Sequence, residues 1–272
     1  MRVWVNDRLL EHADEPAVTA ADHGLTVGDG VFEAIKVVDG EPFALTRHLE
    51  RLTRSAAGLG LPEPDHDRVR GAVEATIAGQ DLPLGRIRIT WTGGPAPMGS
   101  GRGDSGATLV VATGTAEPWE PATRVVTVPW PRNEHGALAG LKTTSYAENV
   151  VALARAHQAG ASEAIFGNTA GHLCEGTGTN VFYVLDGELR TPTLASGCLA
   201  GVTRALVLEW YGGREVDGPL DVLERASEIF LTSTTRDVQP VTRCDARELE
   251  VGPITRAVQE SWAQRQTTDL DP

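Results

Sequence analysis

The chain has 272 residues, of which 41% are hydrophobic and 22% charged, the composition of a soluble globular protein with one large or two smaller domains. Its formal net charge of -13 argues against a nucleic-acid or acidic-membrane partner, because a surface of that sign repels phosphate. An anionic ligand would therefore need a local pocket.

The sequence shows no clear targeting peptide, membrane span or cysteine pattern. The opening residues, MRVWVNDRLLEHADEP, carry charges throughout and lack a central apolar run, so we expect neither a signal peptide nor a transit peptide. No stretch approaches the roughly 20 apolar residues that a membrane helix needs. The three cysteines, Cys174, Cys198 and Cys244, are too few and too scattered for a disulfide scaffold or a zinc site. We therefore expect a cytoplasmic protein without a metal.

The first half of the chain opens with strand patterns. Val3 and Val5 alternate with polar neighbours, and a second apolar run over 31–38 ends at Asp39-Gly40, a hairpin signal. These patterns predict paired strands at the start of a small α+β unit.

A helix and two more strands complete this unit. Apolar residues recur at helical spacing from Leu45 to Leu59, with Thr46 as the expected N-cap. Strands are expected over 86–92 and 108–113, flanking the glycine-rich loop GGPAPMGSGRGDSG. The next stretch, GTAEPWEPAT, bears prolines and has no periodicity, so the boundary is placed there. We expect an N-terminal domain over 1–115, a linker over 116–123 and a C-terminal domain over 124–272.

Lys142 lies just ahead of a predicted helix in the second half. Ser145 and Glu148 stand three apart before an apolar run, which is a capping-box pattern, and Gly160 is placed to end the helix. A lysine in this position is most often a solvated charge. The alternative is a Schiff-base lysine, whose amine attacks a carbonyl cofactor once burial or cationic neighbours lower its pKa.

The rest of the second half also predicts an α+β unit. EAIFG, GHLCEGTGTN and VFYVLDGELRTP read as strands, with Asp186-Gly187 as a hairpin turn. In GCLAGVTRALVLEW, glycines precede a helix from about Val202, and SEIFLT leads into STTRDVQPV. GTGTN has the wrong spacing for a dinucleotide fingerprint.

Three features could hold an anion. The GCLAGVT turn offers backbone N–H groups and the Thr203 hydroxyl, residues 233–235 offer further hydroxyls, and Arg51 could supply a fixed positive charge. Each feature alone is more often an ordinary turn, a solvated loop or a surface arginine.

The family resemblance rests on the combination of six sequence blocks and their order. These blocks are GDGVFE, HLERL, LKTTSYAENV, EGTGTNVFYV, GCLAGVTR and FLTSTTRDVQPV. From about Asp22 to Pro240 this order resembles the fold-type IV pyridoxal-phosphate (PLP) enzymes, also called class-IV aminotransferases. The family contains branched-chain and D-amino-acid aminotransferases and aminodeoxychorismate lyase.

The resemblance implies roles for individual residues. Lys142 would carry PLP, and Glu175 would pair with the pyridine nitrogen and keep the ring protonated, as an electron sink requires. Tyr146 falls close to a tyrosine near the cofactor in the aminotransferases, although it is one residue nearer the lysine here. The phosphate-binding residues would be Arg51, Val202, Thr203, Ser233 and Thr234.

The resemblance also implies a fold and partners. The expected fold is that of a two-domain fold-type IV enzyme, D-amino-acid aminotransferase-like, with a small N-terminal and a larger C-terminal α+β domain. The cofactor would lie in the cleft between the domains of a homodimer, and the partner would be a small amino substrate.

Two reactions are open to such an enzyme. Lys142 would take the Cα proton, and its return to the cofactor leads to transamination, whereas loss of a leaving group makes the enzyme a lyase. The loop TGGPAPMGSGRG resembles that of the lyase, which converts 4-amino-4-deoxychorismate to 4-aminobenzoate and pyruvate in folate biosynthesis, and we favour that reaction. The alternatives are an aminotransferase for D-amino or branched-chain amino acids, a non-catalytic cofactor-binding relative, and a pterin- or nucleotide-binding module.

The substrate carboxylate needs a cation. The lyases carry an arginine before the first glycine of this loop, where this chain has Thr92-Gly93. Arg88 is the expected substitute, with Arg102 second. His23 stands where relatives often carry arginine, and it would either contact substrate or cap a turn.

Overall fold

The computed structural model describes residues 1–272, which form two compact units. Unit 1 comprises Met1–Pro118, Leu141–Ser145 and Leu270–Pro272, and unit 2 comprises Trp119–Gly140 and Tyr146–Asp269. The division differs from the predicted domains at two segments, 141–145 and 270–272, which belong to unit 1. The segment with Lys142 belongs to unit 1, although the sequence pattern assigns it to the domain 124–272.

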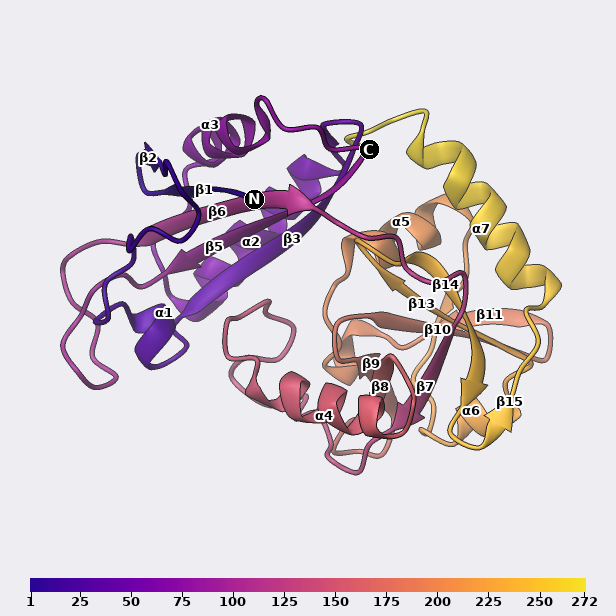
Figure 1. Ribbon diagram of the computed structural model, residues 1–272. Coiled ribbons are helices and arrows are strands. Elements are labelled where there is room, and N and C mark those ends of the chain that lie inside the picture. The colour runs from indigo at the N-terminus through magenta and orange to yellow at the C-terminus, as the bar shows by residue number, and fades with distance from the viewer. The chain divides into compact units, whose positions relative to one another are not determined.

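Unit 1 is built on a six-stranded antiparallel sheet of order β2-β1-β6-β5-β3-β4. Its strands are β1 (Arg2–Val5), β2 (Arg8–Leu9), β3 (Gly30–Val38), β4 (Glu41–Pro42), β5 (Leu84–Thr92) and β6 (Thr108–Thr115), and its helices are α1 (His23–Thr26), α2 (Leu45–Leu59) and α3 (His66–Ile77). Helix α2 packs on β3, and α3 packs on β1 and β6 (Figure 1). The buried leucines, isoleucines and valines of these elements form one apolar core.

The start of α2 is not capped as predicted. The helix begins at Leu45, and its N-cap is Ala44, in the left-handed region at φ 56 and without a side-chain cap. The Thr46 N–H instead donates to Asp271 Oδ1 at 2.8 Å, and the Thr46 hydroxyl bonds to Oδ2. A carboxylate 225 residues away therefore stabilises this helix end, which no local pattern reveals.

Both predicted hairpins are confirmed. Strands β3 and β4 pair through Val38 and Glu41, with Asp39 and Gly40 at φ 50 and 84. The turn at 186–187 has the same form, with φ 53 and 77. Asp-Gly pairs suit this turn because both central positions have positive φ.

Unit 2 contains a nine-stranded sheet of order β12-β11-β10-β13-β14-β7-β8-β9, with β15 paired to β14. Parallel pairs join β11 to β12, β14 to β7 and β7 to β8. The strands are β7 (Thr123–Thr127), β8 (Glu163–Gly167), β9 (Leu173–Gly176), β10 (Asn180–Leu185), β11 (Glu188–Thr191), β12 (Arg214–Glu215), β13 (Glu228–Ser233), β14 (Asp237–Cys244) and β15 (Arg247–Glu248).

The helical elements of unit 2 are α4 (Ala147–Gln158), η1 (Leu194–Ser196), α5 (Val202–Trp210), α6 (Val222–Arg225) and α7 (Pro253–Gln266). Helix α4 packs on β8, and α5 packs on β13, while α7 packs on β13 and β14 (Figure 1). The predicted end of α4 is confirmed, since Gly160 follows the C-cap at φ 70. The predicted capping box is wrong: Tyr146 is the N-cap, no side chain caps it, and the Ser145 hydroxyl donates to the Gly28 carbonyl.

The α+β prediction is confirmed in both units by these mixed layers of helix and mainly antiparallel sheet. Helices α3 and α7 were not anticipated from the sequence. None of the helices combines the length and the apolar composition that crossing a membrane requires.

Candidate active site

Lys142 lies at the edge of the sheet of unit 1, beside β3. Its N–H donates to the Ser55 hydroxyl at 3.2 Å, and its carbonyl accepts from the Phe32 N–H at 2.9 Å. The next residues continue this pairing through a Val31–Thr143 bridge and a Thr144 N–H to Gly30 carbonyl bond of 2.8 Å. The backbone on both sides of the lysine is therefore fixed.

Two cationic side chains meet at the Phe32 ring. Lys142 Nζ lies 4.5 Å from the ring centroid, and Arg88 Cζ lies 3.9 Å from it. Phe32 pairs with Thr90 across β3 and β5, so Arg88, two positions along, projects from the same face of the sheet. Arg88 is exposed, whereas Lys142 is half-buried. An amine and a guanidinium thus lie on one aromatic ring.

The lysine content of the chain sharpens the assignment. The sequence has only two lysines, Lys36 and Lys142. Lys36 lies on β3, is 4% exposed, and its Nζ is 5.4 Å from the Phe43 ring centroid. Lys142 is therefore the more accessible of the two candidates for carrying a carbonyl cofactor.

Arg51, predicted to bind phosphate, is oriented by a buried carboxylate. Its Nε and Nη2 donate to Glu33 at 2.8 and 2.7 Å, and His48 Nδ1 lies 2.7 Å from the same carboxylate. Burial alone raises the pKa of Glu33, but Arg51 and His48 outweigh it and lower the pKa to about 2. Burial lowers the pKa of His48. The phosphate role of Arg51 stays a prediction.

Arg102 and His23 make contacts that shape the glycine-rich loop. The Arg102 guanidinium donates to both Asp29 carboxylate oxygens at 2.7 and 2.6 Å and to the carbonyls of Gly60 and Leu59. The hydrogen bond from Arg102 lowers the pKa of Asp29 against the effect of burial. His23 is 1% exposed, and its Nε2 lies 3.1 Å from the Pro97 carbonyl.

These contacts favour a loop-positioning role for both residues. Their contact with substrate stays a prediction. Arg88 is an exposed residue, and its guanidinium lies on the Phe32 ring that Lys142 Nζ also approaches.

Glu175, the predicted partner of the pyridine nitrogen, lies on β9 in unit 2. Its Oε2 accepts the Leu199 N–H at 2.9 Å, and Arg132 Nε lies 3.4 Å from its Oε1. Burial raises the pKa of Tyr146, and the charge of Glu175 adds to that effect. Arginine and a backbone N–H both favour an ionised carboxylate, which suits a protonated pyridine nitrogen.

The predicted phosphate turn has the local structure that an anion requires. Helix α5 begins at Val202, and its N-cap, Gly201, brings no capping side chain. A Cβ at Gly201 would overlap Asn180 Oδ1, and Asn180 also bonds the Leu199 carbonyl at 2.8 Å. An added Cβ would therefore displace the Asn180 side chain, and the helix start offers backbone N–H groups beside Thr203.

The second predicted phosphate loop joins β13 to β14. Ser233 ends β13, and its hydroxyl accepts from the Arg236 N–H at 3.3 Å. Arg236 pairs with the buried Glu163 at 3.5 Å and stacks on Trp119, with Cζ 3.6 Å from the ring centroid. Burial raises the pKa of Glu163 and lowers that of Arg236. The loop carrying Ser233 and Thr234 is thus anchored by an ion pair in unit 2.

The sequence pattern assigns no role to Arg132 or to the Glu163–Arg236 pair, and Glu33 in GDGVFE does not distinguish the lyase from the D-amino-acid enzyme. Each acts through contacts between residues distant in sequence, so periodicity gives no signal for them.

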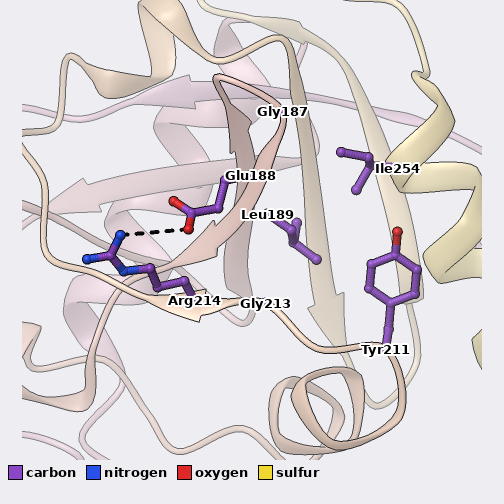
Figure 2. Close-up of a pocket in the computed structure, with 7 residues that line it drawn as sticks. All are labelled: Gly187, Glu188, Leu189, Tyr211, Gly213, Arg214 and Ile254. Carbon is purple, nitrogen blue, oxygen red and sulfur yellow. Dashed lines mark ion pairs between the residues drawn. The ribbon is translucent and has the colours of Figure 1, made fainter.

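Figure 2 shows a pocket in unit 2 that is separate from all of these residues. It is lined by Gly187, Glu188, Leu189, Tyr211, Gly213, Arg214 and Ile254. Glu188 and Arg214 form an ion pair of 3.7 Å in it. No predicted site residue lines this pocket, so it is not the candidate active site.

The groups described above fit PLP. An accessible lysine amine suits the aldehyde, a carboxylate paired with arginine suits the pyridine nitrogen, and an uncapped helix start suits the phosphate.

The family model for class IV amino-transferases matches residues 30–244, and the chain belongs to this family. A Methanocaldococcus jannaschii protein provisionally named a branched-chain-amino-acid aminotransferase is 31% identical, over 98% of this chain and 97% of the relative. The D-alanine aminotransferase of Listeria innocua is 29% identical, over 94% and 92%.

Solved structures agree with this assignment. A fold IV transaminase from Curtobacterium pusillum has a TM-score of 0.83 at 33% identity, covering 93% of this chain and 92% of that one. A Legionella pneumophila protein provisionally described as a 4-amino-4-deoxychorismate lyase has a TM-score of 0.87 at 29% identity, covering 94% and 97%. A hypothetical aminotransferase from Mycobacterium tuberculosis, solved with PLP bound, has a TM-score of 0.85 at 27% identity, covering 97% and 99%.

The resemblance to fold-type IV enzymes is therefore confirmed, together with the fold, the enzymatic nature of the protein and its PLP cofactor. The preference for the lyase is less well supported than its alternative, since the named relatives are mostly branched-chain or D-alanine aminotransferases.

Proposed function

We propose that this enzyme transfers the amino group of a small amino acid, a D-amino acid or a branched-chain amino acid, to a 2-oxo acid. The observation that carries the proposal is the pair of Lys142 Nζ and Arg88 Cζ at 4.5 and 3.9 Å from the Phe32 ring centroid. An amino acid carries its carboxylate next to the reacting Cα, so a cation beside the reacting lysine can hold the substrate in place.

Each residue then has a defined task. PLP supplies the electrophilic carbon and the electron sink. Lys142 would take the proton from Cα of the amino acid as general base and later deliver it to the electrophilic carbon that the cofactor supplies. Arg88 binds the carboxylate, and Glu175 keeps a proton on the pyridine nitrogen. The phosphate would be held by Arg51, Val202, Thr203, Ser233 and Thr234.

Aminotransferase activity is preferred because both named relatives are aminotransferases and cover more than nine-tenths of this chain. The lyase remains a second candidate, favoured by the Legionella structure and by the glycine-rich loop that ends in Gly101-Arg102-Gly103.

The test compares the two reactions on the same purified protein. We would supply D-alanine, L-alanine, L-leucine and L-valine separately with 2-oxoglutarate, and measure glutamate. A second arm would supply 4-amino-4-deoxychorismate without an acceptor, and measure 4-aminobenzoate and pyruvate. Glutamate formed from D-alanine or from the branched-chain donors supports the proposal. Equimolar 4-aminobenzoate and pyruvate over many turnovers, without transamination, would establish the lyase instead.

The homodimer and the cytoplasmic location stay predictions. Light scattering on the purified enzyme tests the dimer, and a mass near 28.9 kDa instead of twice that value would contradict it.

A further inference from the structure

Arg132 has no role in the sequence pattern, but it forms an ion pair with Glu175 of the candidate site. It lies between β7 and α4, and its backbone is bonded on both sides of the residue. The Arg132 N–H donates to the Gly167 carbonyl at 2.8 Å, and its carbonyl accepts from the Thr169 N–H at 3.1 Å. The Cα of Arg132 is therefore fixed against the end of β8.

The guanidinium is held in one orientation by several neighbours. Its Cζ lies 4.1 Å from the Phe166 ring centroid, and Nη2 donates to Asn149 Oδ1. Nη1 donates to Glu148 Oε2 at 3.3 Å, a carboxylate that is 78% exposed. Stacking on an aromatic ring and donating from both ends fix the plane of a guanidinium in a way that lysine cannot reproduce.

The remaining side of the guanidinium faces Glu175. Arg132 Nε lies 3.4 Å from Glu175 Oε1, and the two side chains are 16% and 13% exposed. Oε2 of the same carboxylate accepts the Leu199 N–H at 2.9 Å. Each oxygen of Glu175 thus has its own positive or donating neighbour, and low exposure strengthens the attraction relative to water.

We propose that Arg132 is a positioning residue that orients the Glu175 carboxylate and keeps it ionised, so that Glu175 can hold the proton of the pyridine nitrogen. This inference rests on the proposed role of Glu175. Without the arginine, the carboxylate loses the neighbour that fixes Oε1, so Glu175 is held less firmly toward the pyridine nitrogen and PLP binds more weakly. The Asn149 contact extends the support, because Asn149 Nδ2 also donates to the Thr177 carbonyl, two residues after Glu175.

The experiment measures PLP affinity, by titrating apoenzyme and following the quenching of tryptophan fluorescence. The variants are Arg132→Met, Arg132→Lys, Glu175→Gln and the double variant Arg132→Met/Glu175→Gln. The control is Glu148→Gln, which removes the exposed partner of Arg132 and leaves the Glu175 contact in place. Thermal unfolding of each apoenzyme shows whether the variants fold.

We expect Arg132→Met to raise the Kd for PLP by about tenfold or more, because it leaves the largely buried Glu175 carboxylate without its ion-pair partner. Arg132→Lys should recover part of that loss, and Glu148→Gln should leave the Kd unchanged. In the Glu175→Gln background, Arg132→Met should change the Kd by less than about twofold, because the residue it acts through is gone.

An equal effect of Arg132→Met in both backgrounds would overturn the inference, because Arg132 would then act on PLP independently of Glu175. An unchanged Kd in Arg132→Met would overturn it as well. If Arg132→Met does not fold, the same cycle is run with Arg132→Lys, and an additive result there has the same meaning. Failure of wild-type apoenzyme to bind PLP would instead contradict the cofactor assignment, and the two failures are therefore distinguishable.

Discussion

Glu33 and Arg51 form a doubly hydrogen-bonded ion pair in the core of unit 1, with Nε and Nη2 of Arg51 at 2.8 and 2.7 Å from the two carboxylate oxygens. The pair joins the GDGVFE motif on β3 to the HLERL motif on α2. It gives a reason for two sequence motifs, more than ten residues apart, to occur together.

This pair should make stability fall with acid. The pKa of Glu33 is lowered from 4.5 to about 2 in the folded protein. Because the pKa is lower in the folded protein, the ionised Glu33 carboxylate contributes its full stabilisation at pH values above the unfolded pKa of 4.5. That contribution is lost as the pH falls from 4.5 toward 2. The shift corresponds to ~3 kcal/mol as an order of magnitude.

Glu33→Gln should therefore reduce the free energy of unfolding by about 3 kcal/mol or more at neutral pH, because it leaves the Arg51 charge buried without its partner. The difference from wild type should shrink below pH 4.5. Urea unfolding between pH 7 and pH 3 measures it, and a constant difference over that range would contradict the assignment.

Arg88 and Arg86 offer a matched pair of variants. Both project from the same face of β5 and are exposed, but it is Arg88 that lies 3.9 Å from the Phe32 ring centroid beside Lys142. Arg88→Met should raise KM for the amino acid by about 10- to 100-fold with PLP retained, as expected for losing a charged hydrogen bond. Arg86→Met should change KM little. Steady-state kinetics of the two variants measure these KM values. A larger increase in KM for Arg86→Met than for Arg88→Met would contradict the assignment of the substrate carboxylate to Arg88.

The turn before α5 predicts a further effect. Gly201→Ala should weaken PLP binding and lower the melting temperature, because the added Cβ overlaps Asn180 Oδ1. Gly71→Ala is the control, since it lies within α3 with open space around it and should stabilise the fold by ~0.5–1 kcal/mol. Apoenzyme titration with PLP and thermal unfolding test both variants. Unaltered PLP affinity in Gly201→Ala would argue against phosphate binding at this turn.

Local chemistry predicted the turns and the family motifs. Asp39-Gly40 and Asp186-Gly187 were identified because their positive φ angles are a property of two adjacent residues. Lys142 could be predicted because it lies in one of the family motif blocks, and the order of those blocks is read from the sequence without knowledge of packing.

Long-range contacts could not be predicted in this way. Thr46 is the second residue of α2 and not its cap, since Asp271 supplies the carboxylate from the far end of the chain. Ser145 bonds the Gly28 carbonyl in place of capping α4. The assignment of Lys142 to unit 1 likewise depends on its backbone bonds to Phe32 and Ser55. In each case a contact between residues distant in sequence determines the local structure, and a local sequence pattern does not contain that information.

The central claim is that Lys142 carries PLP, and the two-lysine composition of the chain makes it directly testable. The measurement is borohydride reduction of the PLP-loaded protein followed by proteolysis and mass spectrometry, on wild type, Lys142→Ala and Lys36→Arg. We predict that wild type and Lys36→Arg carry the reduced cofactor on Lys142. Lys142→Ala should carry none and lose nearly all turnover. Label on Lys36 in wild type, or a label that persists in Lys142→Ala, would contradict the claim.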